Sequence, residues 1–175
     1  MEPSGSTYLF NLSLLAITFA AVSVLVILVR QTIGGKMSEI DVHLITTFVS
    51  LGFVQAIIAV LPPVVELLGL SGRILWAGAS GPAALLLAAV FAHIMWERRK
   101  FAKKGLAPLV ILAFAGQWLA VLILAANAVI PAMQGVGPHA AAVTLSLGTA
   151  MWAFVRRIAS LGGDRLHSDW DLKHG

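Results

Sequence analysis

Long apolar segments separated by short charged ones dominate this 175-residue chain and restrict what it can fold into. A segment of about 20 apolar residues is long enough to cross the hydrocarbon core of a bilayer as an α-helix. Helices suit that environment because their backbone groups are hydrogen-bonded within the segment. Five membrane spans are therefore expected, and their ranges are 9–29, 43–61, 74–96, 107–130 and 139–155.

Charged residues and prolines mark the ends of these segments. Arg30 ends the first segment, Pro62 and Pro63 end the second, and Pro131 ends the fourth. Two interpretations fit the stretch after Pro62: a kinked continuation of the second helix, or a short surface helix that begins with proline. The fifth segment, 139–155, is the shortest, so a re-entrant or interfacial helix is its alternative interpretation.

The composition indicates the same class of protein. Hydrophobic residues make up 59% and charged residues 11% of the chain, whereas soluble domains have roughly 45–50% and 25%. A small globule with so few charged groups would not stay in water, so lipid is the expected solvent. The sequence therefore predicts an all-α polytopic integral membrane helix bundle, one domain over residues 1–175, with a short polar tail from 156 to 175.

The distribution of basic residues predicts the orientation. Eleven of the twelve Lys and Arg residues lie on the flanks that share a side with the C-terminal tail, and only Arg73 lies on the other side. The positive-inside rule then places the N-terminus outside and the C-terminus in the cytoplasm, in a plasma membrane of the bacterial inner-membrane type. The net charge of +4 does not indicate nucleic acid, because the basic residues cluster beside apolar runs.

Several kinds of chemistry find no support in the sequence. The chain has no cysteine, which excludes disulfides, thiolate catalysis and Cys-based metal centres. The sequence presents no nucleophile–base pair and no metal cluster, so we expect no enzymatic activity, no cofactor and no metal. His43 and His93 lie near the same side of neighbouring spans and are considered as haem or metal ligands. The favoured interpretation is that each lies in the headgroup layer or bonds a neighbouring group, and His139 lies on the opposite side.

Uncharged polar residues inside the spans carry the functional hypotheses. No Asp, Glu, Lys or Arg lies deep within a span, and such residues usually mark proton relays and coupling-ion sites. The polar candidates are Thr47, Ser50, Gln55, Gln117 and Asn127. One interpretation is that they join helices, with the amides acting as glue. The other is that they line a cavity or pore, because a polar lining without charge is compatible with conduction.

Small residues also recur four positions apart within the spans. Examples are Ala16 with Ala20 and Gly52 with Ala56. Such pairs allow two helices to approach closely, but they are too common in membrane helices to identify the partners from sequence.

The densest charge lies between the third and fourth spans. The residues are Arg98, Arg99, Lys100, Lys103 and Lys104. Basic residues near a membrane surface attract anionic lipid by roughly 1 kcal/mol each. We therefore expect this cluster to contact anionic lipid headgroups in addition to fixing the topology.

Two classes of function follow from these observations. The first is a homo-oligomeric pore or channel-like protein with an uncharged polar lining, because a bundle of this size has little room for a lumen of its own. The second is a structural or regulatory subunit of a larger membrane protein complex. The expected partners are membrane lipids together with further copies of the chain or other membrane subunits, and nucleic acid is not among them.

Overall fold

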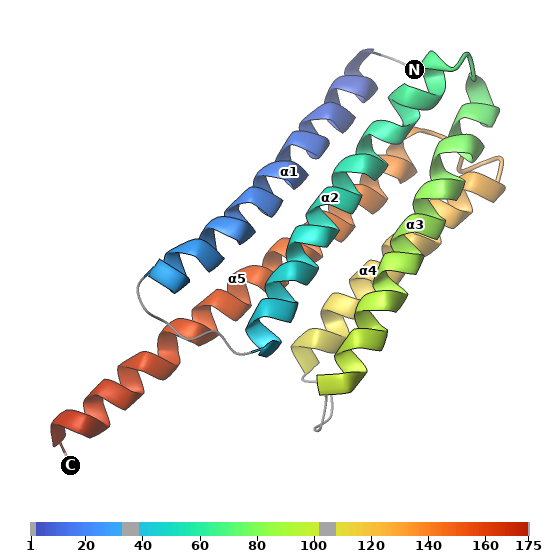
Figure 1. Cartoon of the computed structure of the whole chain (residues 1–175). Helices are drawn as coiled ribbons and strands as arrows, with labels where there is room; N and C mark the ends of the chain where they lie inside the picture. The colour runs from blue at the N-terminus through green and yellow to red at the C-terminus, as the bar shows by residue number, and fades with distance from the viewer. Residues whose placement is uncertain (1–2, 33–38, 102–107, 175) are drawn as a thin grey trace.

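All the regular structure in the described residues, 3–32, 39–101 and 108–174 of a computed structural model, is α-helical. The helices are α1 Pro3–Thr32, α2 Glu39–Leu67, α3 Gly72–Phe101, α4 Pro108–Val129 and α5 Val136–His174. They run alternately up and down and lie side by side (Figure 1). We call the end that holds the N-terminus and the α2–α3 and α4–α5 turns the N-terminal end, and the opposite end the C-terminal end.

Four of the helices are long and apolar enough to cross a membrane. The stretches concerned are Gly5–Val26, Val42–Leu67, Gly72–Arg99 and Ile111–Val129. The chain is thus an all-α bundle with the helices of a multi-pass integral membrane protein. α5 is not one of the four because its many small and polar residues lower its mean hydropathy. A membrane crossing by α5, and the orientation of the bundle, stay predictions.

α2 is continuous through Pro62 and Pro63 and ends at Leu67, so the structure shows the continued helix rather than a separate surface helix. Its end is closed by two backbone bonds, from the Gly69 N–H to the Glu66 carbonyl and from the Leu70 N–H to the Val65 carbonyl. Gly69 has a φ of +86°, a left-handed conformation that glycine adopts without a steric cost. This tight turn returns the chain as α3, antiparallel to α2.

Small residues set the contact between α1 and α2. A Cβ added to Gly52 would lie 2.9 Å from both the Ala16 carbonyl oxygen and the Ala20 Cβ. The backbones of the two helices therefore approach closely at this point, as small residues in membrane helices allow. The structure thus identifies the partner of one of the small-residue pairs seen in the sequence.

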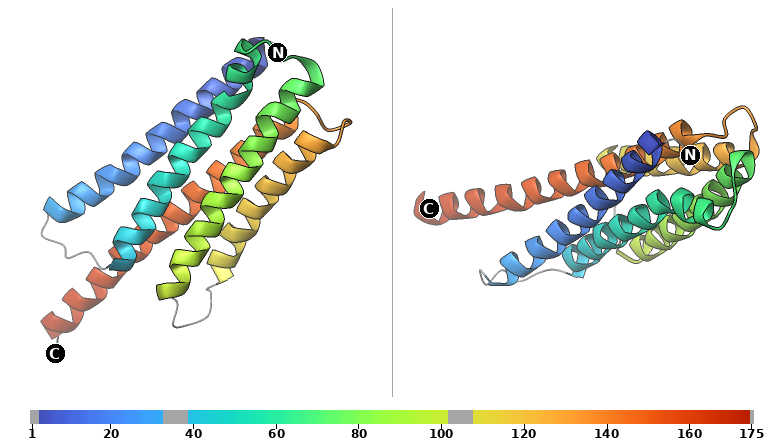
Figure 2. Two further views of the ribbon diagram at one scale, coloured as in Figure 1. Left: turned by 45° about the vertical axis from the view of Figure 1, so that its right-hand side comes forward. Right: turned by 90° about the horizontal axis from the view of Figure 1, so that it is seen from above.

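The core of the bundle takes buried apolar residues from all five helices, and α1 joins it through contacts with α2 and α5. Large apolar side chains on the outer surface are exposed, among them Leu14 at 63%, Leu85 at 74% and Leu122 at 63%. Such a surface is expected where lipid is the solvent. At the C-terminal end α5 continues well beyond the other helices, as both views of Figure 2 show.

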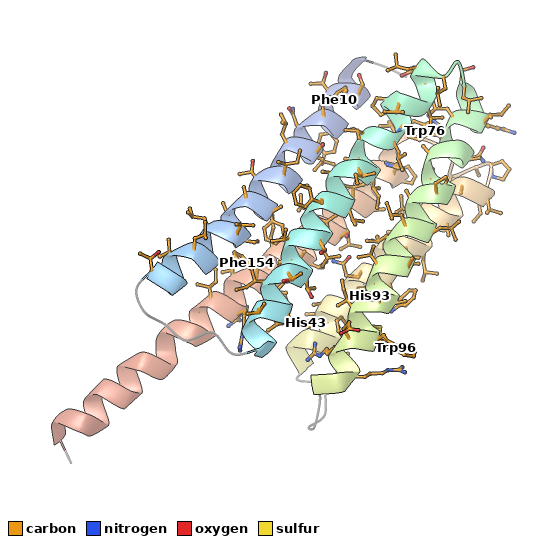
Figure 3. All side chains as sticks on the ribbon, viewed as in Figure 1. Phe10, His43, Trp76, His93, Trp96 and Phe154 are labelled. Atoms are coloured by element: carbon orange, nitrogen blue, oxygen red, sulfur yellow. The ribbon has the colours of Figure 1, made fainter. Side chains whose placement is uncertain are left out.

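Aromatic rings fill the half of the bundle near the C-terminal end. Phe19 of α1, Phe48 of α2 and Phe154 of α5 meet edge to face, with centroids 5.3–6.3 Å apart. Phe154 is labelled near the middle of Figure 3. A second group joins α3 to α4, where the Phe91 ring lies 5.0 Å from Phe114 and 5.6 Å from Trp118.

Candidate functional site: a buried polar network

From the middle of the bundle to its N-terminal end, polar side chains are shielded from the surroundings. Six of them, from four different helices, are 0–3% exposed: Gln55, Ser80, Gln117, Asn127, His139 and Ser146. Burial of a polar group is costly unless it is hydrogen-bonded. The partners of these side chains therefore decide what the region can do, and they fall into an outer group and a central group.

The outer group is organised around His139, which lies in the first turns of α5. Its Nε2 lies 3.0 Å from the carbonyl oxygen of Ile58 in α2, and a carbonyl oxygen only accepts, so Nε2–H is the donor. Ile58 is four residues before Pro62, and proline has no N–H to bond that carbonyl within the helix. His139 thus satisfies the carbonyl that Pro62 leaves free, which is how membrane helices accommodate proline.

Ser80 and Asn127 complete the outer group. In the neutral ring Nδ1 of His139 is an acceptor, so the Ser80 hydroxyl, 2.9 Å away, donates to it. The Ser80 oxygen accepts from the Asn127 Nδ2–H at 2.7 Å. The Asn127 Oδ1 in turn accepts from the backbone N–H of Gly135 at 2.9 Å. One chain of hydrogen bonds therefore joins α2, α3, α4 and α5 and holds the α4–α5 turn.

The central group is organised around Ser146 of α5. Its hydroxyl accepts from the Gln55 Nε2–H of α2 at 2.8 Å and donates to the Gln117 Oε1 of α4 at 2.7 Å. The Gln117 Nε2–H donates to the Ser146 carbonyl at 2.8 Å and to the Thr149 hydroxyl at 2.9 Å. Three helices are therefore joined at one serine. Gly116 is needed beside it, because an added Cβ would overlap the Thr149 side chain.

One atom of the central group is left without a partner. The Oε1 of Gln55 is buried and accepts no hydrogen bond within the described residues. A buried acceptor of this kind normally has an ordered water or another donor beside it. The Gln55 Oε1 is therefore the acceptor of the central group whose bonding capacity is unused within the described residues.

The predicted polar residues divide into two sets. Gln55, Gln117 and Asn127 belong to the network. Thr47 is half-buried and donates to the carbonyl of His43 within its own helix, while Ser50 is exposed on the surface of α2. The hypothesis that all five line a cavity or pore stays a prediction.

Sequence reasoning missed Ser80, His139 and Ser146. The Ser80–His139 contact is the type of hydroxyl–imidazole pair that nucleophilic enzymes use. Both side chains are, however, 0% exposed, so a substrate cannot reach the hydroxyl in this arrangement. One signal was present in the sequence: Pro62 inside a long apolar helix frees a carbonyl, and a histidine in another span can donate to it.

The other histidines lie at the opposite end of the bundle. Figure 3 places His43 near the lower end of α2 and His93 near the lower end of α3. His43 is half-buried and His93 is exposed. In the part of the chain that the structure describes, no three His, Asp or Glu side chains are grouped so as to hold a metal ion.

The basic cluster separates into residues with different surroundings. The Arg98 guanidinium lies 5.3 Å from the centroid of the Phe114 ring, whereas Arg99 is exposed. The side chain of Lys100, and all of Lys103 and Lys104, lie outside the described residues.

The network consists of neutral donors and acceptors that join helices of one chain. Hydrogen bonding of this kind can fix a structure, hold a polar molecule or pass a proton along a chain of hydroxyl and imidazole groups. No protein-family model, curated protein or solved structure matches this chain. Its function is therefore inferred from the geometry of the buried hydrogen bonds.

Proposed function

We propose that the chain is a non-enzymatic structural or regulatory subunit of a membrane protein complex. The observation that carries this proposal is the use of the long buried amides. Gln55, Gln117 and Asn127 each bond to a different helix from their own. Interhelical hydrogen bonds specify which helices associate, because lipid offers no alternative partner to the polar groups.

The burial of these amides also indicates whether they could line a pore formed by several copies of the chain. A pore on a symmetry axis takes its lining from the surface of each protomer. Gln55, Gln117 and Asn127 are 1%, 3% and 0% exposed in the single chain. Their burial supports a joining role over a lining role in such an assembly.

The surface of the bundle offers contacts to other subunits. Its lipid-facing sides are apolar and can be covered by foreign membrane helices. The extension of α5 beyond the bundle, visible in Figure 2, is available to a partner at the C-terminal end. A subunit that is rigid inside and accessible along its sides and at one end fits a role in assembly or regulation.

A second function is favoured by one specific observation. The Oε1 of Gln55 accepts no hydrogen bond within the described residues; a water molecule bound to it would supply a donor, and polar side chains with water beside them are what a conduction path requires. A channel-like function, with the path inside one chain, is therefore the second candidate.

Two measurements on the purified chain separate the candidates. The first is ion and water flux in reconstituted vesicles, for the wild type and for Gln55→Leu and Gln117→Leu, with the lipid-facing Thr18→Val as the matched control. We expect flux equal to that of empty vesicles for all four proteins. The second is the native mass of the particle extracted from its own membrane, which we expect to exceed one chain by the mass of other subunits.

Two results would overturn the subunit proposal. The first is a flux in the wild type that the two leucine variants abolish and Thr18→Val preserves, which would establish the channel. The second is a native mass that is an integral multiple of this chain, which would favour the homo-oligomer.

A further inference from the structure

The two adjacent arginines of α3 lie about 100° apart around the helix axis and have different surroundings. Arg98 faces α4, with its guanidinium over the Phe114 ring at 5.3 Å. A cation over an aromatic ring is attracted by the negative face of the ring, so this guanidinium is engaged within the protein. Arg99 is exposed and has no ion-pair partner among the described residues, so its charge faces the surroundings.

Arg99 shares its side of α3 with two other exposed side chains. His93, Trp96 and Arg99 are spaced three residues apart, so each lies about 60° around the helix axis from the next, with Trp96 between the other two. Trp96 is 65% exposed and His93 is also exposed. Figure 3 shows His93 and Trp96 near the lower end of α3. We call these three residues the α3 surface.

The environment of the α3 surface changes along the helix. All three residues lie in the apolar stretch Gly72–Arg99, and Leu85, 74% exposed, lies on the same side nearer the middle of the bundle. Arg99 therefore lies where the apolar stretch ends. Trp96 lies one turn inside it, at a depth where indole rings favour the headgroup layer.

We propose that the α3 surface binds the headgroup of one anionic phospholipid. The Arg99 guanidinium bonds to the phosphate in a forked geometry, and the Trp96 indole N–H and the His93 ring supply further donors. The acyl chains lie along the apolar side of α3 toward Leu85. This arrangement does not depend on the orientation of the bundle in the membrane.

Three features favour a lipid as the occupant. The surface is cationic where it meets the headgroup layer and apolar beyond, which complements a molecule with an anionic head and apolar tails. A free phosphate would use only these polar donors and would leave the exposed apolar side chain of Leu85 without a role. Glu97, the acidic residue of this turn, is half-buried and lies about 160° from Arg99 around the helix axis, so its carboxylate is directed away from the Arg99 guanidinium.

The test uses the full chain in a neutral detergent, titrated with phosphatidylglycerol or phosphatidylcholine. Bound lipid per chain is measured by native mass spectrometry. We expect phosphatidylglycerol to bind more tightly, and Arg99→Ala to weaken its binding about fivefold, since a basic residue near the surface contributes roughly 1 kcal/mol. Trp96→Ala should weaken both lipids, and Arg99→Lys should retain most of the preference.

Three controls test whether the change in lipid binding is specific to the α3 surface. Arg98→Ala should change phosphatidylglycerol binding less than Arg99→Ala and should lower the melting temperature. Arg73→Ala, at the other end of the bundle, should change neither. Soluble glycerol phosphate should fail to displace the lipid. Helix content by circular dichroism verifies that each variant is folded.

Several outcomes would overturn the proposal. They are equal binding of the two lipids by the wild type, equal losses for Arg98→Ala and Arg99→Ala, and displacement of the lipid by glycerol phosphate. The last result would identify a phosphate site in place of a lipid site.

Discussion

From the middle of the bundle to its N-terminal end, hydrogen bonds between buried polar side chains join α2, α3, α4 and α5, whereas from the middle to the C-terminal end aromatic rings join the helices. In the first half, His139 and Ser146 each bond to two other helices. In the second half, Phe154 meets a ring from α1 and a ring from α2.

The difference between the halves follows from the solvent. Lipid tails are as apolar as the side chains of the core, so an apolar contact between helices gains little from leaving lipid. A ring that loses its partner can pack against an acyl chain. A donor or acceptor that loses its partner finds nothing in lipid to replace it. The polar half therefore defines which helices are neighbours, and the aromatic half contributes close packing.

The largest effect is expected for His139→Ala. This change leaves the Ile58 carbonyl and the Ser80 hydroxyl without their partners and creates a cavity. We expect a loss of about 2–4 kcal/mol in the free energy of unfolding in mixed micelles. Hydrogen exchange should show the α4–α5 turn opening first, because His139 lies just after this turn and its two bonds hold the start of α5 to α2 and α3. A loss below that of Phe154→Ala would break the comparison between the halves.

A smaller effect is expected for Phe154→Ala in the aromatic half. Two edge-to-face contacts are lost, each worth roughly 0.5–1.5 kcal/mol, so the free energy of unfolding should fall by about 1–3 kcal/mol. Lipid can occupy part of the space, and Phe154→Leu should therefore recover most of the loss. If the leucine variant is as unstable as the alanine variant, the rings are as specific as the hydrogen bonds.

A still smaller effect is expected for Gln117→Leu in the central group. The change removes bonds to Ser146 and Thr149, and interhelical bonds in membranes average about 0.6 kcal/mol. The free energy of unfolding should fall by about 1–2 kcal/mol. The exposed Ser50→Ala on α2 is the matched control and should change it by less than about 0.5 kcal/mol. If Gln117→Leu left the free energy of unfolding unchanged, the central group would not contribute to the stability of the bundle.

Part of this structure follows from the sequence in a direct way. Apolar length predicts the helices of the bundle, because backbone pairing in lipid allows few alternatives. The positions of Gln55, Gln117 and Asn127 predict that each requires a partner or water. The identity of the partner depends on how the helices are rotated about their axes. These helices are apolar on most sides, so their sequence does not determine which side faces a neighbouring helix.

The missed residues show the same limit. Nothing in the local sequence of Ser80 or Ser146 separates them from serines that bond their own helix, as Ser23 does with the Phe19 carbonyl. Arg98 and Arg99 are the same residue type at adjacent positions, so the sequence does not distinguish their surroundings. Their roles differ because about 100° of helix rotation per residue places Arg98 toward α4 and leaves Arg99 outside.

The central claim is that His139 satisfies the backbone carbonyl that Pro62 leaves free, and that this bond helps to fix the neighbours of α5. The most direct measurement is a double-mutant cycle in the free energy of unfolding with Pro62→Ala and His139→Ala. Alanine at position 62 restores an N–H that can bond the Ile58 carbonyl within α2. We predict that His139→Ala costs about 1 kcal/mol less in the Pro62→Ala background than in the wild type. Equal costs in the two backgrounds would show that the residues act independently and would contradict the account.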